Sequence, residues 1–86
     1  MNRVFIKLAF GTTADSLLRL CKQYADVCGA WIVKDEAGYS RGIGFADVTT
    51  FADAVRLIEE INGRVYEGHR LIADHARPKA WGGTSP

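Results

Sequence analysis

Two short stretches of this 86-residue chain place aromatic rings and positive charges in alternation. In "FIK", Phe5 and Lys7 are two positions apart. In "RGIGF", Arg41 is followed at every second position by Ile43 and then Phe45. Side chains that alternate in this way share one face of a β-strand. Flat rings stack on nucleobases and neighbouring cations meet phosphates, so the combination predicts binding of a single-stranded nucleic acid.

The second stretch also carries Gly42 and Gly44, which are expected on the opposite side of the same strand. Glycine in a strand interior costs backbone entropy and offers no side chain to pack. With Ala46 and Val48, these glycines make an inner side of small residues, which would let a helix approach closely. The large side chains are all sent outward, an inversion that predicts a binding role for the outer face.

The rest of the chain predicts the elements that must position these side chains. Period-two alternation indicates strands, and threonines followed three residues later by aspartate indicate the starts of helices. The N-caps are expected at Thr12 and Thr50. We expect strands over residues 3–9, 29–35, 41–48 and 70–77, and helices over 12–27 and 50–63.

The order βαββαβ predicts an α+β, ferredoxin-like sandwich, in which two helices cover one face of a four-stranded antiparallel sheet. The other face must meet solvent or a partner. A contiguous apolar patch of this kind marks a binding surface. By alternation, the open face should collect Phe5, Trp31, Val33, Ile43, Phe45 and Ile72, surrounded by Arg3, Lys7 and Arg41.

Composition and charge limit the partners and the location that can be expected. Hydrophobic residues make up 48% and charged residues 24%, as in a folded protein, and the net charge is only +1. Nucleic-acid affinity must therefore depend on charge gathered on one face or on stacking. No apolar run is long enough for a membrane helix, so no membrane partner is expected. Cys21 and Cys28 lack metal-ligand spacing and are expected to be reduced thiols in an intracellular protein.

The sequence contains no nucleophile–base pair, no paired carboxylates at a supported site and no phosphate-binding loop. We therefore expect a protein that is not an enzyme and has no metal, cofactor or small-molecule substrate.

Two stretches, "VFIKLA" (Val4–Ala9) and "RGIGFADV" (Arg41–Val48), resemble the RNP2 hexamer and the RNP1 octamer of the RNA-recognition motif family. The resemblance runs from Asn2 to about Pro78, which predicts a domain over residues 1–78 and a flexible tail over 79–86. It implies that Phe5 and Phe45 stack bases of single-stranded RNA and that Arg41 contacts a phosphate.

Three positions depart from the family pattern. Ile43 stands where a third aromatic is usual, Leu8 replaces an asparagine, and Asp47 puts a negative charge on the sheet. Trp31 on the neighbouring strand is expected to supply a substitute stacking surface. The remaining candidate contacts to the RNA backbone are Lys7 and Arg77, and Trp81 in the tail has no assigned role.

Two alternatives stay open from the sequence alone. Some members of the family bind peptides through an Arg-x-Phe motif before the last strand, and Arg64-Val65-Tyr66 partly matches it. The apolar sheet face is also suited to self-association or to covering by a second domain. The expected partners are therefore single-stranded RNA and, in addition, other RNA-binding proteins or a second domain.

Overall fold

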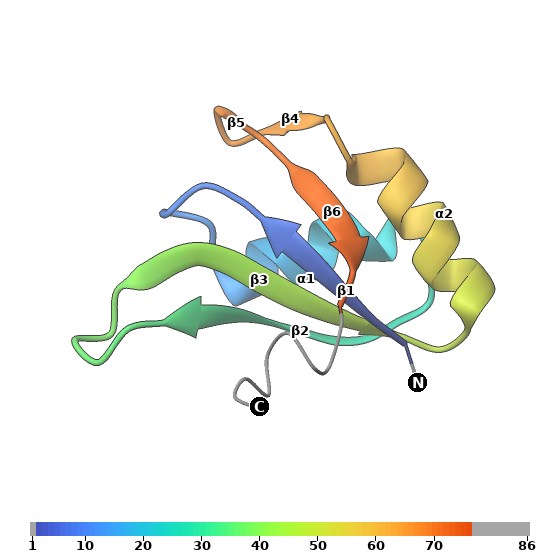
Figure 1. Ribbon diagram of the computed structural model, residues 1–86, viewed down its shortest axis with the longest axis horizontal. Helices are drawn as coiled ribbons and strands as arrows, with labels where there is room; N and C mark the ends of the chain where they lie inside the picture. Colours follow the sequence, from blue (N-terminus) through green and yellow to red (C-terminus); the bar gives the residue numbers. More distant parts are fainter. Residues whose placement is uncertain (1, 77–86) are drawn as a thin grey trace.

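The computed structural model describes residues 2–76. Its elements, in chain order, are β1 (Asn2–Lys7), α1 (Ala14–Lys22), β2 (Val27–Lys34), β3 (Ser40–Val48), α2 (Phe51–Ile61), β4 (Val65–Tyr66), β5 (His69–Arg70) and β6 (Ile72–His75) (Figure 1). β2, β3, β1 and β6 form one antiparallel sheet in that spatial order, and β4 pairs only with β5. The predicted α+β sandwich is confirmed.

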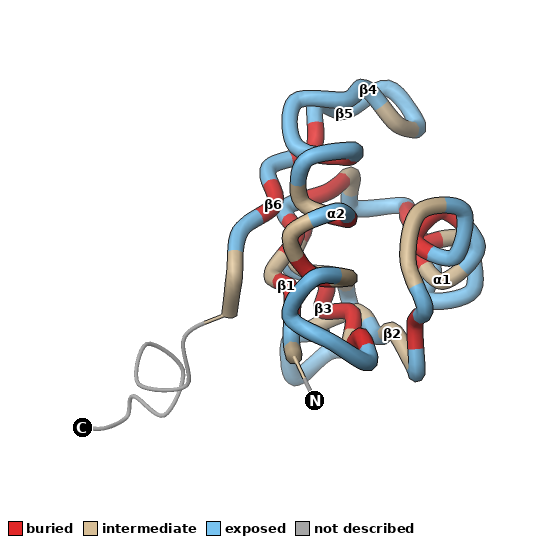
Figure 2. Tube along the Cα trace, turned by 90° about the vertical axis from the view of Figure 1, so that its right-hand side faces the viewer, coloured by how far each residue is buried: buried red, intermediate tan, exposed pale blue. Residues whose placement is uncertain are grey.

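The core lies between the sheet and the two helices, which cover the same face (Figure 2). The inward-facing apolar side chains of β1, β3 and β6 are buried, whereas Ala30 and Ile32 of β2 are half-buried against the core. Each helix buries one apolar side, and Tyr24 and Ile58 are half-buried beside it. Full burial of an aliphatic side chain stabilises a fold by about 1.5–3 kcal/mol. The sheet contributes Val4, Ile6, Val27, Ala46, Val48 and Ala73, and the helices contribute Leu17, Leu20, Cys21, Ala54, Leu57 and Ile61.

The two glycines of β3 serve different purposes. A Cβ on Gly44 would lie 2.7 Å from Cδ2 of Leu17, so its absence lets α1 approach the sheet, as predicted. Gly42 has φ +74°, a conformation that other residues rarely adopt. A Cβ there would lie 2.8 Å from the ring of Phe10. Gly42 therefore makes room for the β1–α1 loop rather than for a helix.

The first helix begins one residue later than its predicted cap. Thr13, not Thr12, is the N-cap, and its hydroxyl accepts a hydrogen bond of 3.1 Å from the Ser16 N–H. Thr12 is buried and donates instead to Glu67. The second helix has the predicted cap, because the Thr50 hydroxyl accepts a 3.1 Å bond from the Asp53 N–H.

The segment before the last strand, for which the sequence predicts neither a helix nor a strand, is more ordered than expected. Val65–Tyr66 and His69–Arg70 form a small hairpin, so the predicted strand over 70–77 begins only at Ile72. The hairpin is attached to the start of α1. The Tyr66 hydroxyl donates to the Ser16 carbonyl at 3.3 Å, and the Ser16 hydroxyl donates to the Glu67 carboxylate at 2.9 Å.

Candidate nucleic-acid interface

Three aromatic rings lie side by side across the open face of the sheet. The strand register places Phe5 of β1 opposite Phe45 of β3, and Phe45 opposite Trp31 of β2. The Phe5 and Phe45 ring centroids are 5.9 Å apart, and those of Phe45 and Trp31 are 5.7 Å apart. Both separations lie within the range of favourable aromatic pairs. We call Phe5, Phe45 and Trp31 the ring row.

Phe45, the central member of the ring row, is more buried than the sequence indicates. Only 7% of its surface is exposed, although it lies outside the core between sheet and helices. Its strand is central, so a ring flanks it on each side. Phe5 is half-buried and Trp31 is 36% exposed, so these two outer members present more of their surface than Phe45 does.

Beside the ring row, the guanidinium of Arg3 extends from β1 across β3 and contacts Asp47 of β3 and Trp31 of β2. Nε of Arg3 donates to Oδ1 of Asp47 at 2.8 Å, and a second nitrogen donates to Oδ2 at 3.3 Å. The Arg3 guanidinium carbon also lies 4.7 Å from the centre of the Trp31 ring. The hydrogen bond to Asp47 raises the pKa of Arg3. The negative charge expected on the sheet from Asp47 is therefore paired with a cation.

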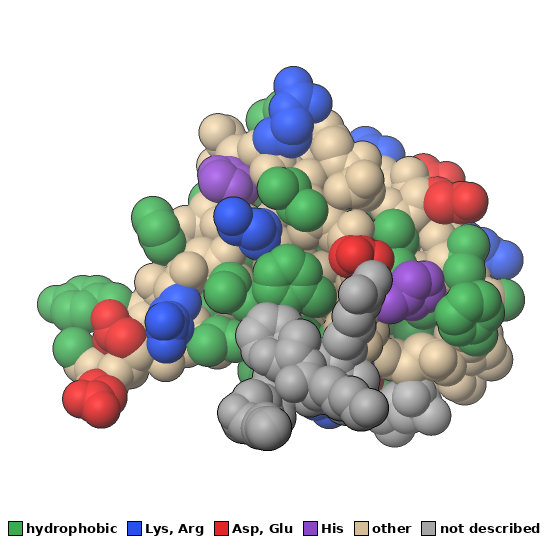
Figure 3. All heavy atoms as spheres, in the orientation of Figure 1, with side chains coloured by type: hydrophobic (Ala, Val, Ile, Leu, Met, Phe, Trp, Pro, Cys, Tyr) green, Lys and Arg blue, Asp and Glu red, His purple; other side chains and the backbone are tan. Residues whose placement is uncertain are grey.

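Lys7 lies on the other side of the ring row, in a largely apolar setting. The register pairs it with Ile43 of β3 and with Ile72 of β6. Ile72 is 49% exposed, Ile43 is half-buried and Lys7 is exposed. Figure 3 shows hydrophobic side chains gathered over the centre of this face, with Lys and Arg side chains among and around them. The structure thus brings together Phe5, Lys7, Trp31, Ile43 and Phe45.

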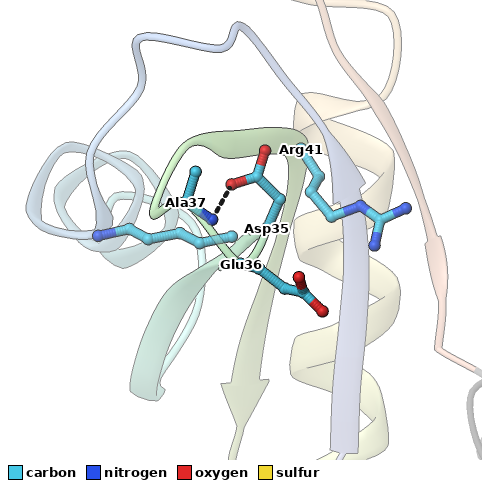
Figure 4. A pocket seen from close by; sticks show the side chains of 5 residues that line it. Asp35, Glu36, Ala37 and Arg41 are labelled. Atoms are coloured by element: carbon cyan, nitrogen blue, oxygen red, sulfur yellow. Dashed lines mark hydrogen bonds between the residues drawn. The ribbon is translucent and has the colours of Figure 1, made fainter.

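Arg41 lies apart from the ring row, where β3 leaves the β2–β3 loop. It borders an open hollow of about 520 Å³ together with Lys34, Asp35, Glu36 and Ala37. Asp35 closes the loop, because its carboxylate accepts from the Ala37 N–H at 2.9 Å and the Tyr39 N–H at 3.0 Å. Figure 4 shows the Arg41 side chain extending away from Asp35. Two carboxylates balance the two cations here, so the hollow itself is not a concentrated positive site.

The side chains of the Arg64-Val65-Tyr66 segment make contacts within the domain. Nε of Arg64 donates to the Glu60 carbonyl at 3.0 Å, and its guanidinium lies 5.2 Å from the centre of the Tyr24 ring. Tyr66 bonds to Ser16 of α1. Arg64 and Tyr66, the two residues that would bind a peptide ligand, thus make contacts with the helices instead.

The remaining predictions concern the C-terminal residues, metal binding, membrane helices and the two cysteines. Arg77 and Trp81, and with them the predicted tail, lie outside the described residues. Within residues 2–76, no group of three His, Cys, Asp or Glu side chains could hold a metal ion. In the same part of the chain, no helix is long and apolar enough to cross a membrane. Both cysteines are free thiols, and burial raises the pKa of Cys21 to about 12.

Sequence reasoning missed the contact among Arg3, Asp47 and Trp31. The signal available was opposite charge at two outward positions of different strands. Its use requires the register between β1 and β3, which the separate strand patterns do not supply.

Comparison with known proteins gives the same assignment as the geometry. The family model of the RNA recognition motif matches residues 4–72. The chain is 31% identical over 79 residues to the cytoplasmic and nuclear polyadenylate-binding protein of Chaetomium globosum, covering 91% of this chain and 10% of that protein. It is 36% identical over 80 residues to glycine-rich RNA-binding protein 8 of Arabidopsis thaliana, covering 88% of this chain and 46% of that protein.

Solved structures agree. RNA binding protein PG1 superposes with a TM-score of 0.83 at 32% identity, covering 88% of this chain and 94% of the other. A Sxl-lethal protein/RNA complex superposes with a TM-score of 0.83 at 30% identity, covering 91% of this chain and 48% of the other. The chain belongs to the RNA recognition motif family.

Proposed function

We propose that this domain binds single-stranded RNA across the open face of its sheet. The observation that carries the proposal is the ring row, in which two partly exposed rings flank a third on neighbouring strands. Arg3 and Lys7 lie on either side of Phe5 along β1 and add positive charge. A sheet of this kind stacks two or three bases. The family membership and the relatives named as RNA-binding proteins support this assignment.

The side chains take different roles in the proposal. Phe5 and Trp31 stack bases on their accessible surfaces, and Phe45 supports both rings while presenting its small exposed part. Ile43 offers an apolar contact to a sugar. Lys7, Arg41 and Arg77 are proposed to contact phosphates. The net charge of +1 means that stacking, more than charge, carries the affinity.

The proposal concerns a binding module, and no reaction is assigned to it. The chain spans about a tenth of the polyadenylate-binding relative and less than half of the glycine-rich relative. Other RNA-binding domains or proteins are therefore proposed as partners. A domain over residues 1–78 with a tail over 79–86 and an intracellular location are likewise proposed. Names of relatives that specify cytoplasm and nucleus, or mitochondria, support the location.

The decisive experiment is a fluorescence-anisotropy titration of the wild type, Phe5→Ala and Trp31→Ala with short labelled poly-U, poly-A and mixed-sequence RNAs. Each ring removed should weaken binding by about 1–3 kcal/mol, because base stacking on an aromatic ring contributes that amount. Circular dichroism confirms that each variant is folded.

Phe51→Ala is the matched control. Phe51 is an exposed ring at the start of α2 that stacks on His75 at 5.2 Å, away from the ring row. Its removal should leave RNA affinity within twofold of wild type. If the wild type binds none of the RNAs, or if the two ring-row variants bind as well as Phe51→Ala, the proposal fails.

A further inference from the structure

We propose that Asp47 and Trp31 form a guanine-selective subsite, which the Arg3 side chain occupies in the free domain. The inference rests on the proposed RNA-binding function and names a base that this face would select. Its starting point is the shape and chemistry of the group already bound there. A flat guanidinium lies on the Trp31 ring and directs two N–H groups at the two oxygens of one carboxylate.

The geometry of that contact defines what else fits. The two nitrogen–oxygen distances from Arg3 to Asp47 are 2.8 and 3.3 Å, and the guanidinium lies 4.7 Å from the Trp31 ring centre. An ionised carboxylate only accepts hydrogen bonds, and it favours a planar partner with two parallel donors. The subsite therefore selects a planar group that stacks and presents two adjacent N–H groups.

Among the four RNA bases, guanine meets both conditions. Its Watson–Crick edge carries N1–H and the N2 amino group side by side, which matches the two donors of a guanidinium. Adenine and cytosine each place a ring nitrogen lone pair next to their amino group. Uracil has one N–H between two carbonyls. Each of these three bases would direct a lone pair at an oxygen of Asp47, which is repulsive.

The structure leaves room for a base at this position. Asp47 is paired across the sheet with Gly29 of β2, so the two residues face the same side. A Cβ built on Gly29 would meet no atom of residues 2–76 within 4 Å. A base lying on Trp31 can thus extend toward Asp47 without meeting a side chain at Gly29.

Arg3 can leave the subsite only if another donor pair replaces it. The Arg3 side chain is 53% exposed and can move into solvent, whereas the Asp47 side chain is 16% exposed and would be costly to leave unpaired. In the complex, the carboxylate exchanges one pair of donors for another, and Trp31 exchanges a cation for a base. The released guanidinium remains on β1 beside the RNA and pairs with a phosphate, which offsets the loss of Asp47.

The test measures binding of short uridine RNAs that carry one central guanosine, adenosine, inosine or 7-deazaguanosine. A single guanosine avoids association of the RNA strands. We expect the wild type to prefer guanosine over adenosine by about tenfold, in line with the discrimination of a bidentate contact. Inosine lacks the N2 amino group and should lose the preference. 7-Deazaguanosine keeps the Watson–Crick edge and should retain it.

Asp47→Asn should remove the preference, because its amide offers one donor and one acceptor. Asp74→Asn is the matched control: Asp74 is an exposed carboxylate paired with Phe5 on the same face, and its variant should keep the preference. Arg3→Gln should keep or increase the ratio of guanosine affinity to adenosine affinity, because the competing occupant of the subsite is gone. Overall RNA affinity should fall, because the phosphate contact of the released guanidinium is lost.

Three results would overturn the inference while leaving RNA binding intact. The first is equal affinity for all bases, and the second is a guanosine preference that survives in Asp47→Asn. The third is a preference that is lost with 7-deazaguanosine but kept with inosine. The last pattern would mean that the base is read on its other edge, by an arginine. Failure of the wild type to bind any of these RNAs would instead remove the proposed function itself.

Discussion

The two sides of the central strands β1 and β3 differ in the size of the side chains that lie opposite each other. On the inner side, Ile6 of β1 lies opposite Gly44, whose missing side chain is replaced by Leu17 of α1. On the outer side, Phe5 lies opposite Phe45, and both rings are large. Within residues 2–76, both helices lie on the other side of the sheet. The inner side is organised for stability and the outer side for contact with a ligand. Substitution of an inward residue should therefore lower mainly the stability, and substitution of its outward neighbour mainly the RNA affinity.

Ile6→Ala should give the largest loss of stability. Ile6 is fully buried, and truncation of a core isoleucine costs about 2–5 kcal/mol of unfolding free energy. Urea denaturation measures the loss. Its neighbour in sequence, Phe5→Ala, should lose less stability and more RNA affinity. If Ile6→Ala is as stable as Phe5→Ala, the distinction between the two sides is wrong.

Gly42→Ala should be the next largest effect. The left-handed backbone at φ +74° costs a residue with a Cβ about 1–2 kcal/mol, and the added methyl would press on the Phe10 ring. Thermal denaturation should show the loss. Adding Phe10→Ala relieves only the steric part, so full recovery in the double variant would contradict a backbone cause.

Tyr66→Phe should reduce stability by about 0.5–1.5 kcal/mol, the net contribution of a hydrogen bond, because it removes the hydroxyl that bonds to Ser16. RNA affinity should not change, since this hairpin contacts the helix side. Paired denaturation and anisotropy experiments check both parts. A selective loss of RNA binding in this variant would extend the interface beyond the sheet.

The smallest effect is expected from Asp53. Its pKa is lowered, chiefly by the hydrogen bond from the Thr50 hydroxyl. A carboxyl with a lowered folded-state pKa contributes stability above its unfolded pKa and loses it as the pH falls through the folded value. The contribution should therefore disappear below about pH 4. Stability measured against pH should be flatter in this range for Asp53→Asn, and an unchanged slope would contradict the assignment.

The strand alternation and the positions of the two helices could be predicted from the sequence because each depends on residues close together in the chain. For this reason the sequence was sufficient to predict the fold and to place Phe5 and Ile43 on the open face of the sheet. The contacts of the Phe45 ring with Phe5 and Trp31 could not be predicted, because they join three different strands. The pairing of Arg3 with Asp47 joins residues 44 positions apart and requires the register. The cap at Thr12 was misplaced because two consecutive threonines offer the same hydroxyl.

The strand order has a consequence for how the ring row behaves over time. β1 and β3 are central, so their backbones are hydrogen-bonded on both sides, whereas β2 and β6 are at the edges. Amides of doubly paired strands open only in the rarest fluctuations of a domain. We therefore expect slower amide exchange around Phe5 and Phe45, which lie on central strands, than around Trp31, which lies on an edge strand. A ligand would find two rings already in place and would have to order only the third, which reduces the entropy lost on binding.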